Sequence, residues 1–484
     1  MKKTKIVLFA LNASFSHSNL ALRRLREKLD ESIYDVSLLE GTLRDSDSSF
    51  LEALFKENGD VYAFSCYIWN IERMLCLCKN LKSLRPDTVN VFGGPEVSYD
   101  SERFTSFDFI DCVVSGSGED AFARICDDVR NGNSIPKYIS GGKTPLYDGI
   151  LYRSNEALPK TLYYESSVGC PFSCAFCLSS AEKGVIAKSD AQTLDELLEF
   201  EKIDGDFIVK FIDRSFNFDV KRANAIWEGL LDPKYTKRYQ FEVCASLLNE
   251  ESFALLSRFP SGKVQLEAGL QSTNEQTLAA VARHQNVNAT LESCMRIKES
   301  GNVHVHLDLI AGLPYEDYSS FKKSYNDAYF CCDQLQLGFL KLLFGTALRR
   351  DAKKYGYKFL SEPPYTVLCN DYISYTELRR LDTVADLTDR YYNSGHFEQT
   401  LDYAVRFAIS PFDFYEGLAD FIEKNDGRSI RKIGQNDAYA LLFTYASSFE
   451  GIDCDTLESA LHSDYAKYEV RRPPRLIRAS KNES

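Results

Sequence analysis

Two stretches of the chain alternate short apolar segments with amphipathic ones, and this alternation constrains the fold more than any other feature. Helical periodicity separates the apolar segments of the first stretch, as in residues 71–85. Apolar strands joined by amphipathic helices predict a parallel, doubly wound (Rossmann-like) sheet. The strands expected there span residues 5–12, 34–39, 61–66, 89–92 and 112–115.

A second stretch repeats the alternation after residue 160. Six consecutive strand–helix units with right-handed crossovers predict an open, partial (β/α)6 TIM barrel. Its strands are expected at residues 161–167, 207–213, 239–245, 264–270, 304–311 and 334–342. The predicted fold class is therefore α/β, and the helical periodicity that follows adds a C-terminal α-helical domain. The expected division is 1–140, a linker over 141–160, the barrel over 161–350, and the helical domain over 351–484.

Ligands of such sheets bind at the carboxyl ends of the strands. In the first stretch those ends carry the segments 13–19, 66–70, 93–98 and 116–119. Two of these segments contain glycine pairs, Gly93 with Gly94 and Gly116 with Gly118, which allow a backbone to approach a bulky ligand closely. A tight turn explains each pair equally well, but four such loops on one edge favour a binding site.

Charge and cysteine content narrow the functional classes. A net charge of −13 argues against binding to a phosphate backbone, so we expect no nucleic-acid partner. The sequence shows neither a signal-peptide pattern nor an apolar run of about 20 residues, so we expect no membrane association and a cytoplasmic location. Because cytoplasmic thiols stay reduced, clustered cysteines among the 14 present indicate metal binding or catalysis rather than disulfides.

Cys170, Cys174 and Cys177 form a Cys-x3-Cys-x2-Cys motif directly after the first predicted barrel strand. Three closely spaced thiolates can ligate three irons of a [4Fe-4S] cluster, which usually takes four cysteines, so one iron stays open to a ligand. A zinc knuckle is the alternative, but it needs a fourth ligand at similar spacing. Cys112 and Cys126 are too distant in sequence to supply it.

With Phe176 just before its last cysteine, the motif resembles the signature of the radical S-adenosylmethionine (SAM) superfamily. The resemblance implies a [4Fe-4S] cluster whose open iron chelates SAM, and reductive cleavage of SAM to a 5′-deoxyadenosyl radical. Downstream, Gly269-Leu-Gln271-Ser272 and Asp308-Leu-Ile-Ala-Gly-Leu-Pro314 are similar to motifs of the subgroup that contains coproporphyrinogen dehydrogenase. By this resemblance the SAM contacts are Tyr164, Phe176, Asp213, Glu242, Gln271, Arg283 and Asp308. Arginine suits the SAM carboxylate because guanidinium forms paired hydrogen bonds.

The second barrel strand departs from the family pattern. A Gly-Gly-Glu-like turn usually follows that strand and receives the amino group of SAM, whereas this chain reads Phe211-Ile-Asp-Arg-Ser-Phe-Asn217. Asp213, Arg214 and Asn217 are the candidates to replace the turn.

The N-terminal stretch resembles the cobalamin-binding domain that precedes the barrel in cobalamin-dependent radical SAM enzymes. None of the six histidines has an aspartate two positions before it, so the Asp-x-His-x-x-Gly cobalt-ligand motif is absent from the sequence. The resemblance therefore implies cobalamin bound without an imidazole from that motif, although His17 remains a candidate contact. The cobalamin contacts expected from it are Ser14, His17, Ser65, Tyr67, Gly93, Gly94, Glu96, Gly116, Gly118 and Glu119.

Together these resemblances imply an enzyme that methylates an unactivated carbon of a small-molecule or peptide substrate, with flavodoxin or ferredoxin as electron donor. By resemblance, a radical on the substrate takes the methyl group from methylcobalamin, and a second SAM restores that group. Two alternatives stay open: a radical cyclase or rearrangement enzyme that uses cobalamin, and a cobalamin or redox sensor.

Overall fold

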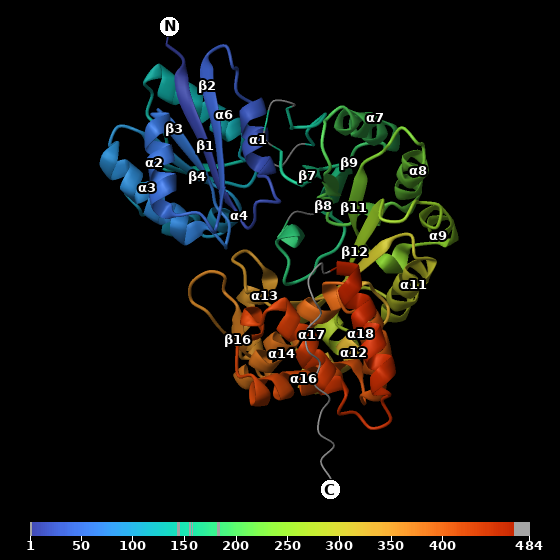
Figure 1. The fold of residues 1–484 in the computed structure, drawn as a ribbon. Coiled ribbons are helices and arrows are strands. Elements are labelled where there is room, and N and C mark those ends of the chain that lie inside the picture. Colours follow the sequence, from blue (N-terminus) through green and yellow to red (C-terminus); the bar gives the residue numbers. More distant parts are fainter. Residues whose placement is uncertain (1, 143–145, 154–155, 157, 182–183, 469–484) are drawn as a thin grey trace.

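A computed structural model describes residues 2–142, 146–153, 156, 158–181 and 184–468. Figure 1 shows three parts in chain order: a blue N-terminal part, a green barrel beside it, and an orange-to-red helical part below both. Among the described residues, no helix is both long and apolar enough to cross a membrane.

The N-terminal part is a six-stranded parallel sheet with the order β2-β1-β3-β4-β5-β6. Its strands are β1 (Thr4–Asn12), β2 (Tyr34–Thr42), β3 (Val61–Ser65), β4 (Val89–Gly93), β5 (Cys112–Ser115) and β6 (Tyr138–Ser140). The five predicted strands are confirmed, and β6 is one that the sequence analysis missed. It is only three residues long, and its burial pattern lacks the apolar run that marks the others. The chain order changes direction between β1 and β3, which is where such sheets open a ligand crevice.

Helices cover both faces of this sheet. They are α1 (Leu20–Glu27), α2 (Asp47–Glu57), α3 (Ile71–Leu84), α4 (Pro95–Ser98), α5 (Ser101–Thr105) and α6 (Glu119–Asn131). Leu22 of α1 and Ile125 of α6 pack on one face, and Leu54 of α2 and Met74 of α3 pack on the other. The α1 helix begins where the Asn19 side chain accepts a hydrogen bond from the Leu22 amide, as N-cap residues do.

The barrel is a second parallel sheet with the order β14-β13-β12-β11-β10-β7, open between its first and last strands. These strands are β7 (Thr161–Tyr164), β10 (Ile208–Phe211), β11 (Arg238–Val243), β12 (Val264–Gln271), β13 (His304–Ala311) and β14 (Gln334–Phe339). The surrounding helices are α7 (Asp190–Glu201), α8 (Val220–Leu230), α9 (Glu250–Leu256), α10 (Glu275–Ala280), α11 (Val287–Ser300) and α12 (Tyr318–Tyr329). The predicted six-stranded partial barrel is confirmed.

The cysteine motif lies outside this sheet. The chain leaves β7, turns, and forms an antiparallel hairpin of β8 (Ser167–Cys170) and β9 (Gly184–Ala187), in which Cys170 pairs with Gly184. The prediction of one continuous strand over residues 161–167 was therefore wrong. Glu165 and Ser166 form the break between the two strands.

The C-terminal part is mainly helical but includes a two-stranded hairpin, β15 (Lys358–Phe359) with β16 (Val367–Cys369). The predicted C-terminal helical domain is confirmed, and this hairpin is an element that the sequence pattern did not predict. Its helices are α13 (Ala347–Arg350), α14 (Tyr375–Leu387), α15 (Glu398–Ala404), α16 (Pro411–Asn425), α17 (Gln435–Ala446) and α18 (Cys454–Tyr468). These helices and the barrel share one continuous hydrophobic core, which includes Tyr325 of α12 and Tyr415 of α16.

Candidate functional site

The cysteine motif occupies the loop of the β8–β9 hairpin, and the barrel holds that loop by its backbone. The Ala175 amide donates to the Val281 carbonyl at 2.8 Å, and the Leu348 amide donates to the Ala175 carbonyl at 2.9 Å. Cys174 is buried, while Cys170 and Cys177 are half-buried. Burial raises the pKa of the Cys170 thiol, and Cys177 and Cys174 add smaller contributions to that rise.

Among the described residues, no three His, Cys, Asp or Glu side chains are arranged around a single metal ion. In a [4Fe-4S] cluster each cysteine ligates its own iron, so three thiols around one cluster do not converge on one ion. The three cysteines lie on one loop whose backbone is held by hydrogen bonds, and their thiols are the usual ligands of an iron–sulfur cluster.

Beside the cysteines, Gln271 and Arg283 meet at the carboxyl end of β12. The Arg283 guanidinium donates to the Gly269 carbonyl and contacts the Cys174 sulfur at 3.6 Å. A Cβ on Gly269 would lie 2.2 Å from Gln271 Nε2, so a larger residue there would displace the Gln271 amide. Gln271 has a φ of 68° and is 9% exposed, and its Oε1 lacks any hydrogen-bond partner in the described part of the chain. Buried polar atoms are normally paired, so this oxygen fits a site for a polar ligand.

Acidic side chains line the inner face of the barrel close to this point. Glu242 and Glu267 are directly opposite each other on β11 and β12, and Asp308 lies on the next strand, β13, opposite Gly269. Burial and the repulsion from Glu267 and Glu242 raise the pKa of Asp308 to about 7. Burial and Glu267 likewise raise the pKa of Glu242. Asp308 Oδ1 is a second buried oxygen without a partner among the described residues.

Lys210 supplies the counter-charge to this acidic face. Its ammonium lies 3.0 Å from Glu267, and both side chains keep about a fifth to a quarter of their surface exposed (21% and 24%) although they sit on the inner face. The Gln240 amide also donates to Glu267, at 2.9 Å. The interior of the barrel is therefore polar and open to solvent at this level. The sequence analysis did not single out Lys210 or Glu267, although both alternate with apolar residues along their strands as inward positions do.

Two of the predicted SAM contacts, Tyr164 and Asp213, do not face the site. Tyr164 points outward, is 3% exposed, and donates to Glu196 of α7 at 2.8 Å. Side chains alternate between the faces of a strand, so the neighbouring Tyr163 faces inward instead. Phe176 is partly buried and packs against the barrel core beside the cysteines.

Asp213 was the other expectation that the structure does not support. It is fully buried and accepts hydrogen bonds from Ser166 at 2.8 Å and Ser167 at 2.5 Å, so its carboxylate supports the turn before β8. Burial raises its pKa to about 6. Asn217 is also occupied, because its amide donates to the Cys244 carbonyl and its oxygen accepts from the Cys244 amide. Arg214 remains: it is exposed, and its charge offsets part of the rise in the pKa of Cys170 and of Glu242.

The loops expected to bind cobalamin lie together at the carboxyl ends of β1, β3, β4 and β5. Tyr67 stacks on Trp69 with ring centroids 4.3 Å apart, and Trp69 is 44% exposed. Phe15, in the first loop, is 70% exposed. These exposed aromatic rings at a strand-end edge fit a large flat ligand such as a corrin ring. The sequence analysis overlooked Trp69 and Phe15; their signal was an aromatic residue in a strand-end loop.

The glycines at this edge leave space or bring backbones close. A Cβ on Gly94 would lie 2.5 Å from the Cys66 carbonyl oxygen, so the β3 and β4 loops pack backbone against backbone. A Cβ built on Gly93 would have its nearest neighbour at 3.9 Å, and a Cβ built on Gly118 would have its nearest neighbour at 3.6 Å. Gly116 has a φ of 70°, and its amide donates to Ser98.

Several polar side chains predicted at the cobalamin edge already have partners. Ser65 accepts from Asn19 at 3.0 Å, and Ser14 shares a hydrogen bond with Ser16 at 3.1 Å. Glu96 is 4% exposed and accepts from Tyr365 of the C-terminal part, so the expectation that it contacts cobalamin does not fit. Glu119 pairs with Arg24 of α1 at 3.6 Å.

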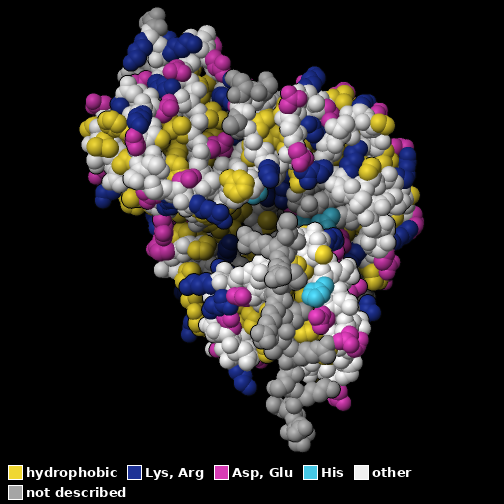
Figure 2. All heavy atoms as spheres, viewed as in Figure 1, with side chains coloured by type: hydrophobic (Ala, Val, Ile, Leu, Met, Phe, Trp, Pro, Cys, Tyr) yellow, Lys and Arg dark blue, Asp and Glu magenta, His cyan; other side chains and the backbone are white. Residues whose placement is uncertain are grey.

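His17 joins the two sheets. Its Nδ1 is 2.7 Å from the Tyr163 hydroxyl on β7, and burial with the nearby charge of Lys210 lowers its pKa. The loop after β1, at the cobalamin edge of the first sheet, therefore contacts the inner side of the barrel. In the space-filling view the surface is hollowed where the three parts of the chain meet, and Lys, Arg, Asp and Glu are interspersed around it (Figure 2).

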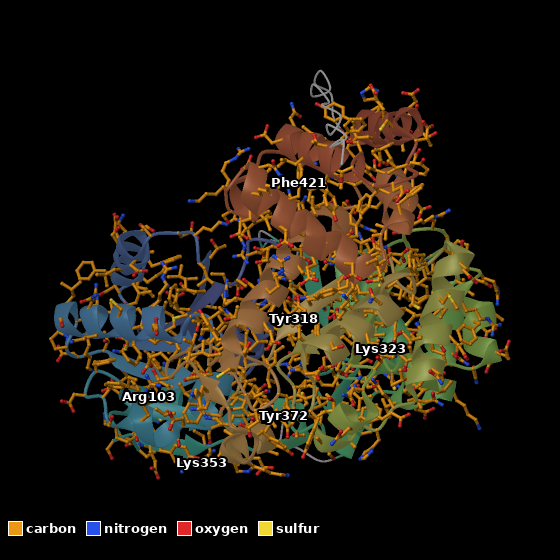
Figure 3. All side chains as sticks on the ribbon, turned by 90° about the horizontal axis from the view of Figure 1, so that it is seen from below. Arg103, Tyr318, Lys323, Lys353, Tyr372 and Phe421 are labelled. Atoms are coloured by element: carbon orange, nitrogen blue, oxygen red, sulfur yellow. The ribbon has the colours of Figure 1, made fainter. Side chains whose placement is uncertain are left out.

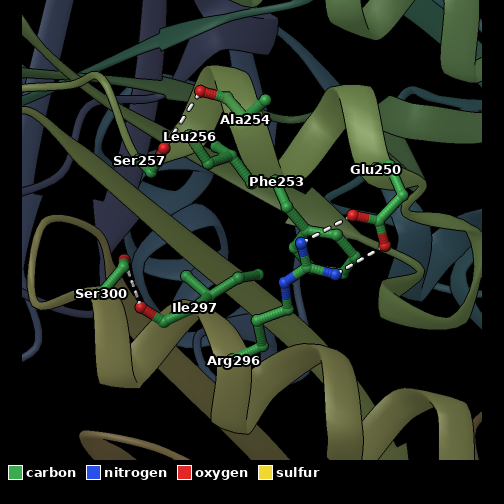
Figure 4. Close-up of a pocket in the computed structure, with 8 residues that line it drawn as sticks. All are labelled: Glu250, Phe253, Ala254, Leu256, Ser257, Arg296, Ile297 and Ser300. Atoms are coloured by element: carbon green, nitrogen blue, oxygen red, sulfur yellow. Dashed lines mark hydrogen bonds and ion pairs between the residues drawn. The ribbon is translucent and has the colours of Figure 1, made fainter.

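A separate pocket lies on the outside of the barrel between α9 and α11 (Figure 4). Arg296 crosses it, packs over the Phe253 ring and binds Glu250 through two hydrogen bonds of 2.6 and 2.7 Å. The charged side chains of this pocket are already paired with each other. The pocket lies away from the cysteines, on the helix side of the sheet.

Comparisons with known proteins agree with this geometry. Residues 6–126 match the family model of the B12 binding domain, and residues 164–328 match the model of the Radical SAM superfamily. Residues 353–484 match a model described as "Protein of unknown function (DUF4080)".

Among relatives, the cobalamin-dependent radical SAM methyltransferase TokK of Streptomyces tokunonensis is 28% identical over 304 residues, which cover 54% of this chain and 44% of that protein. The hopanoid C-3 methylase of Methylococcus capsulatus is 25% identical over 318 residues and 60% of each chain. The chain thus spans less than two thirds of the length of these relatives.

Among solved structures, the cobalamin-dependent S-adenosylmethionine radical enzyme OxsB, with aqua-cobalamin and S-adenosylmethionine bound, matches with a TM-score of 0.63 and 11% identity. This match covers 96% of the present chain and 80% of that one, so the fold is shared over nearly the whole chain. By these matches the chain carries a B12-binding domain ahead of a radical SAM domain, and it is similar to cobalamin-dependent radical SAM methyltransferases.

Proposed function

We propose that this protein is a methyltransferase that transfers a methyl group from SAM to an unactivated carbon of a small-molecule substrate. The observation that carries the proposal is the contact between the two sheets: His17, in the loop after β1, lies 2.7 Å from Tyr163 on the inner face of the barrel, and Arg24 of α1 pairs with Glu165 just before the cysteine hairpin. The relatives named as methyltransferases support the same reaction.

Separate sets of residues would hold the cluster and cobalamin. Cys170, Cys174 and Cys177 would hold the [4Fe-4S] cluster, and the loops after β1, β3, β4 and β5 would hold cobalamin between the exposed aromatic rings and the glycines. When bound, the cluster would supply the electron that cleaves SAM, and cobalamin would carry the methyl group.

SAM would lie at the carboxyl ends of β11 to β13. Arg283 would bind its carboxylate, because a guanidinium offers two parallel charge-assisted hydrogen bonds. Gln271 and Asp308 would use their unpartnered oxygens on its polar groups. Glu242 faces the same space, and Arg214 stands where the family's acidic turn is absent, so we assign it to an anionic group of SAM or substrate.

The three-cofactor proposal also implies an electron donor. A low-potential protein such as flavodoxin or ferredoxin would reduce the cluster. The inner face of the barrel is polar, so it would hold water until SAM and substrate bind. Their binding would displace this water and keep the radical from bulk solvent.

The test is anaerobic purification, cluster reconstitution and product analysis. The optical spectrum should show an iron–sulfur band and cobalamin bands, and incubation with reductant and SAM should release both 5′-deoxyadenosine and S-adenosylhomocysteine. Cys174→Ala should abolish deoxyadenosine. Deoxyadenosine without any S-adenosylhomocysteine would contradict methyl transfer.

Arg283→Lys tests the SAM site directly. Lysine keeps the charge but loses the paired hydrogen bonds, so SAM should bind about tenfold more weakly by calorimetry on the cluster-loaded protein. Arg296→Lys is the matched control, since Arg296 forms an equivalent two-bond ion pair in the outer pocket (Figure 4). Equal SAM affinity in Arg283→Lys and the wild type would remove Arg283 from the site.

A further inference from the structure

Helix α1 contains three arginines that are almost fully buried. The side chains of Arg23, Arg24 and Arg26 are 3%, 9% and 6% exposed. A buried charge destabilises a fold unless it is paired, so the partners of these arginines indicate what each one holds in place. In Figure 1 this helix lies on the side of the first sheet that faces the barrel.

Two of the arginines hold the segment that connects the sheets. Arg23 pairs with Glu40 at 2.7 Å and with Glu156 at 3.2 Å. Arg26 also pairs with Glu156, and it donates to the Leu151 carbonyl at 2.9 Å. Both arginines therefore anchor the connection rather than either cofactor edge.

Arg24 has different partners. One nitrogen of its guanidinium lies 3.6 Å from Glu119, and the other donates to Glu165. Both carboxylates are mostly buried, with 12% and 15% of their side chains exposed. We call these three side chains the Arg24 bridge.

The two carboxylates belong to the two cofactor edges. Glu119 begins α6 and closes the turn after β5, where Gly116 and Gly118 lie and where the Ser117 hydroxyl also donates to Glu119. Glu165 lies in the break between β7 and β8, five residues before Cys170 in the sequence. The Arg24 bridge thus joins the expected cobalamin edge to the base of the cysteine hairpin through one side chain.

Other contacts hold the two sheets together without Arg24. The Thr161 amide donates to the Ser16 carbonyl at 3.0 Å, and the hydroxyl of Ser18 is 3.0 Å from that of Tyr152. Loss of Arg24 should therefore leave the sheets docked while it releases the hairpin from the turn after β5.

We propose that Arg24 is a positioning residue that sets the orientation of the cysteine hairpin relative to the turn after β5, and so the separation of the cluster from cobalamin. The inference rests on the proposed function, because it needs both cofactors. Reactions between two held groups are sensitive to small displacements, and an error of about 1 Å can cost about 100-fold in rate.

The test measures the relation between the two cofactors without the substrate. Full-length protein is loaded with cluster and cobalamin, and electron paramagnetic resonance follows cob(II)alamin with the cluster oxidised and then reduced. In the wild type the reduced cluster should speed the relaxation of the cobalamin signal. In Arg24→Gln this relaxation enhancement should be lost, or should vary from molecule to molecule. The iron and cobalamin content per chain should stay at the wild-type level.

Two further variants separate positioning from general stability. Arg24→Lys keeps the charge and should restore part of the enhancement. Lys28→Gln is the matched control: Lys28 follows α1 directly and pairs with Asp120 of α6 at 2.9 Å, a contact that stays within the first sheet. This variant should keep the full enhancement.

Glu165→Gln provides a second route if Arg24→Gln folds poorly, as judged by thermal unfolding of the cofactor-free protein. It removes the same ion pair from the barrel side and should give the same loss, with no further loss in the double variant. Full enhancement in Arg24→Gln or in Glu165→Gln would overturn the positioning role. A wild type that binds no cobalamin would instead overturn the proposed function, and the inference with it.

Discussion

At the scale of single residues, the candidate SAM site is defined by polar atoms that the fold leaves unpaired. Gln271 Oε1 and Asp308 Oδ1 are buried and lack partners within the described residues. Desolvation without a hydrogen bond costs about 1–3 kcal/mol for such a group, so these positions reduce stability in the absence of a ligand. Positions that lower stability but stand at the centre of a site are expected to serve function.

Asp308 gives a pH-dependent prediction. Its pKa is raised to about 7, so between pH 4 and 7 the folded protein holds a proton that the unfolded chain releases. The contribution of Asp308 to the free energy of unfolding should therefore fall as the pH rises through this range. Asp308→Asn removes the effect, and at pH 8 it should raise the free energy of unfolding by about 1 kcal/mol or more.

Thermal unfolding of the cofactor-free protein at pH 4 and pH 8 measures this difference. The variant and the wild type should unfold alike at pH 4 and diverge at pH 8. Glu292→Gln, at an exposed carboxylate on α11, serves as the control. A pH-independent effect of Asp308→Asn would show that the pKa of Asp308 is not raised in the folded protein.

At the scale of elements, the β8–β9 hairpin presents the cysteines, and its geometry depends on Gly169. This residue has a φ of 91°, and a Cβ would lie only 2.1 Å from the Gly184 carbonyl oxygen across the hairpin. No side chain fits there without separating the strands. The hairpin therefore requires glycine for two reasons, backbone conformation and close approach.

Gly169→Ala should prevent correct pairing of the hairpin and reduce the iron bound per chain after anaerobic reconstitution to a small fraction of the wild-type amount. Gly262→Ala is the matched control, because Gly262 has a φ of 77° but nothing within 4 Å of its Cβ position. The control should lose about 1–2 kcal/mol of stability for its backbone alone and keep its iron. Normal iron content in Gly169→Ala would argue against the hairpin as the cluster support.

At the scale of the whole molecule, the C-terminal part contacts the first sheet as well as the barrel. Tyr365 donates to Glu96 after β4, and Arg103 of α5 pairs with Glu362 at 2.9 Å. Figure 3 shows Arg103 on the N-terminal part close to the segment that carries Lys353 and Tyr372. The turn after β4 is thus held from outside the first sheet, which fixes one edge of the expected cobalamin site.

Tyr365→Phe should weaken this contact. The ring can still pack against Phe344, but the buried Glu96 carboxylate loses the hydrogen bond from the Tyr365 hydroxyl. The free energy of unfolding should fall by about 1–3 kcal/mol in urea denaturation. Tyr375→Phe, at a tyrosine that is 54% exposed, should be neutral. Equal stability of Tyr365→Phe and the wild type would mean that the contact does not hold the two parts together.

The sequence by itself determined the elements and the chemistry of the cysteine motif. Hydrophobic periodicity placed all six barrel strands and five of the six strands of the first sheet, because burial on one or two faces of an element leaves a local signature. The resemblance of short motifs to those of a known family also named Gln271, Arg283 and Asp308 as SAM contacts, and this assignment stays a prediction.

Only the tertiary structure decided which side chains face the site and which are already paired. Tyr163 and Tyr164 are adjacent, and the pairing of β7 with β10 in the barrel sheet decides which of them faces inward. Asp213 and Glu96 have the right chemistry, but Ser166, Ser167 and Tyr365 bind them from segments distant in sequence. Arg24 contacts Glu119 and Glu165 only because α1 packs between the two sheets. Such pairings depend on long-range packing, and local sequence patterns do not record it.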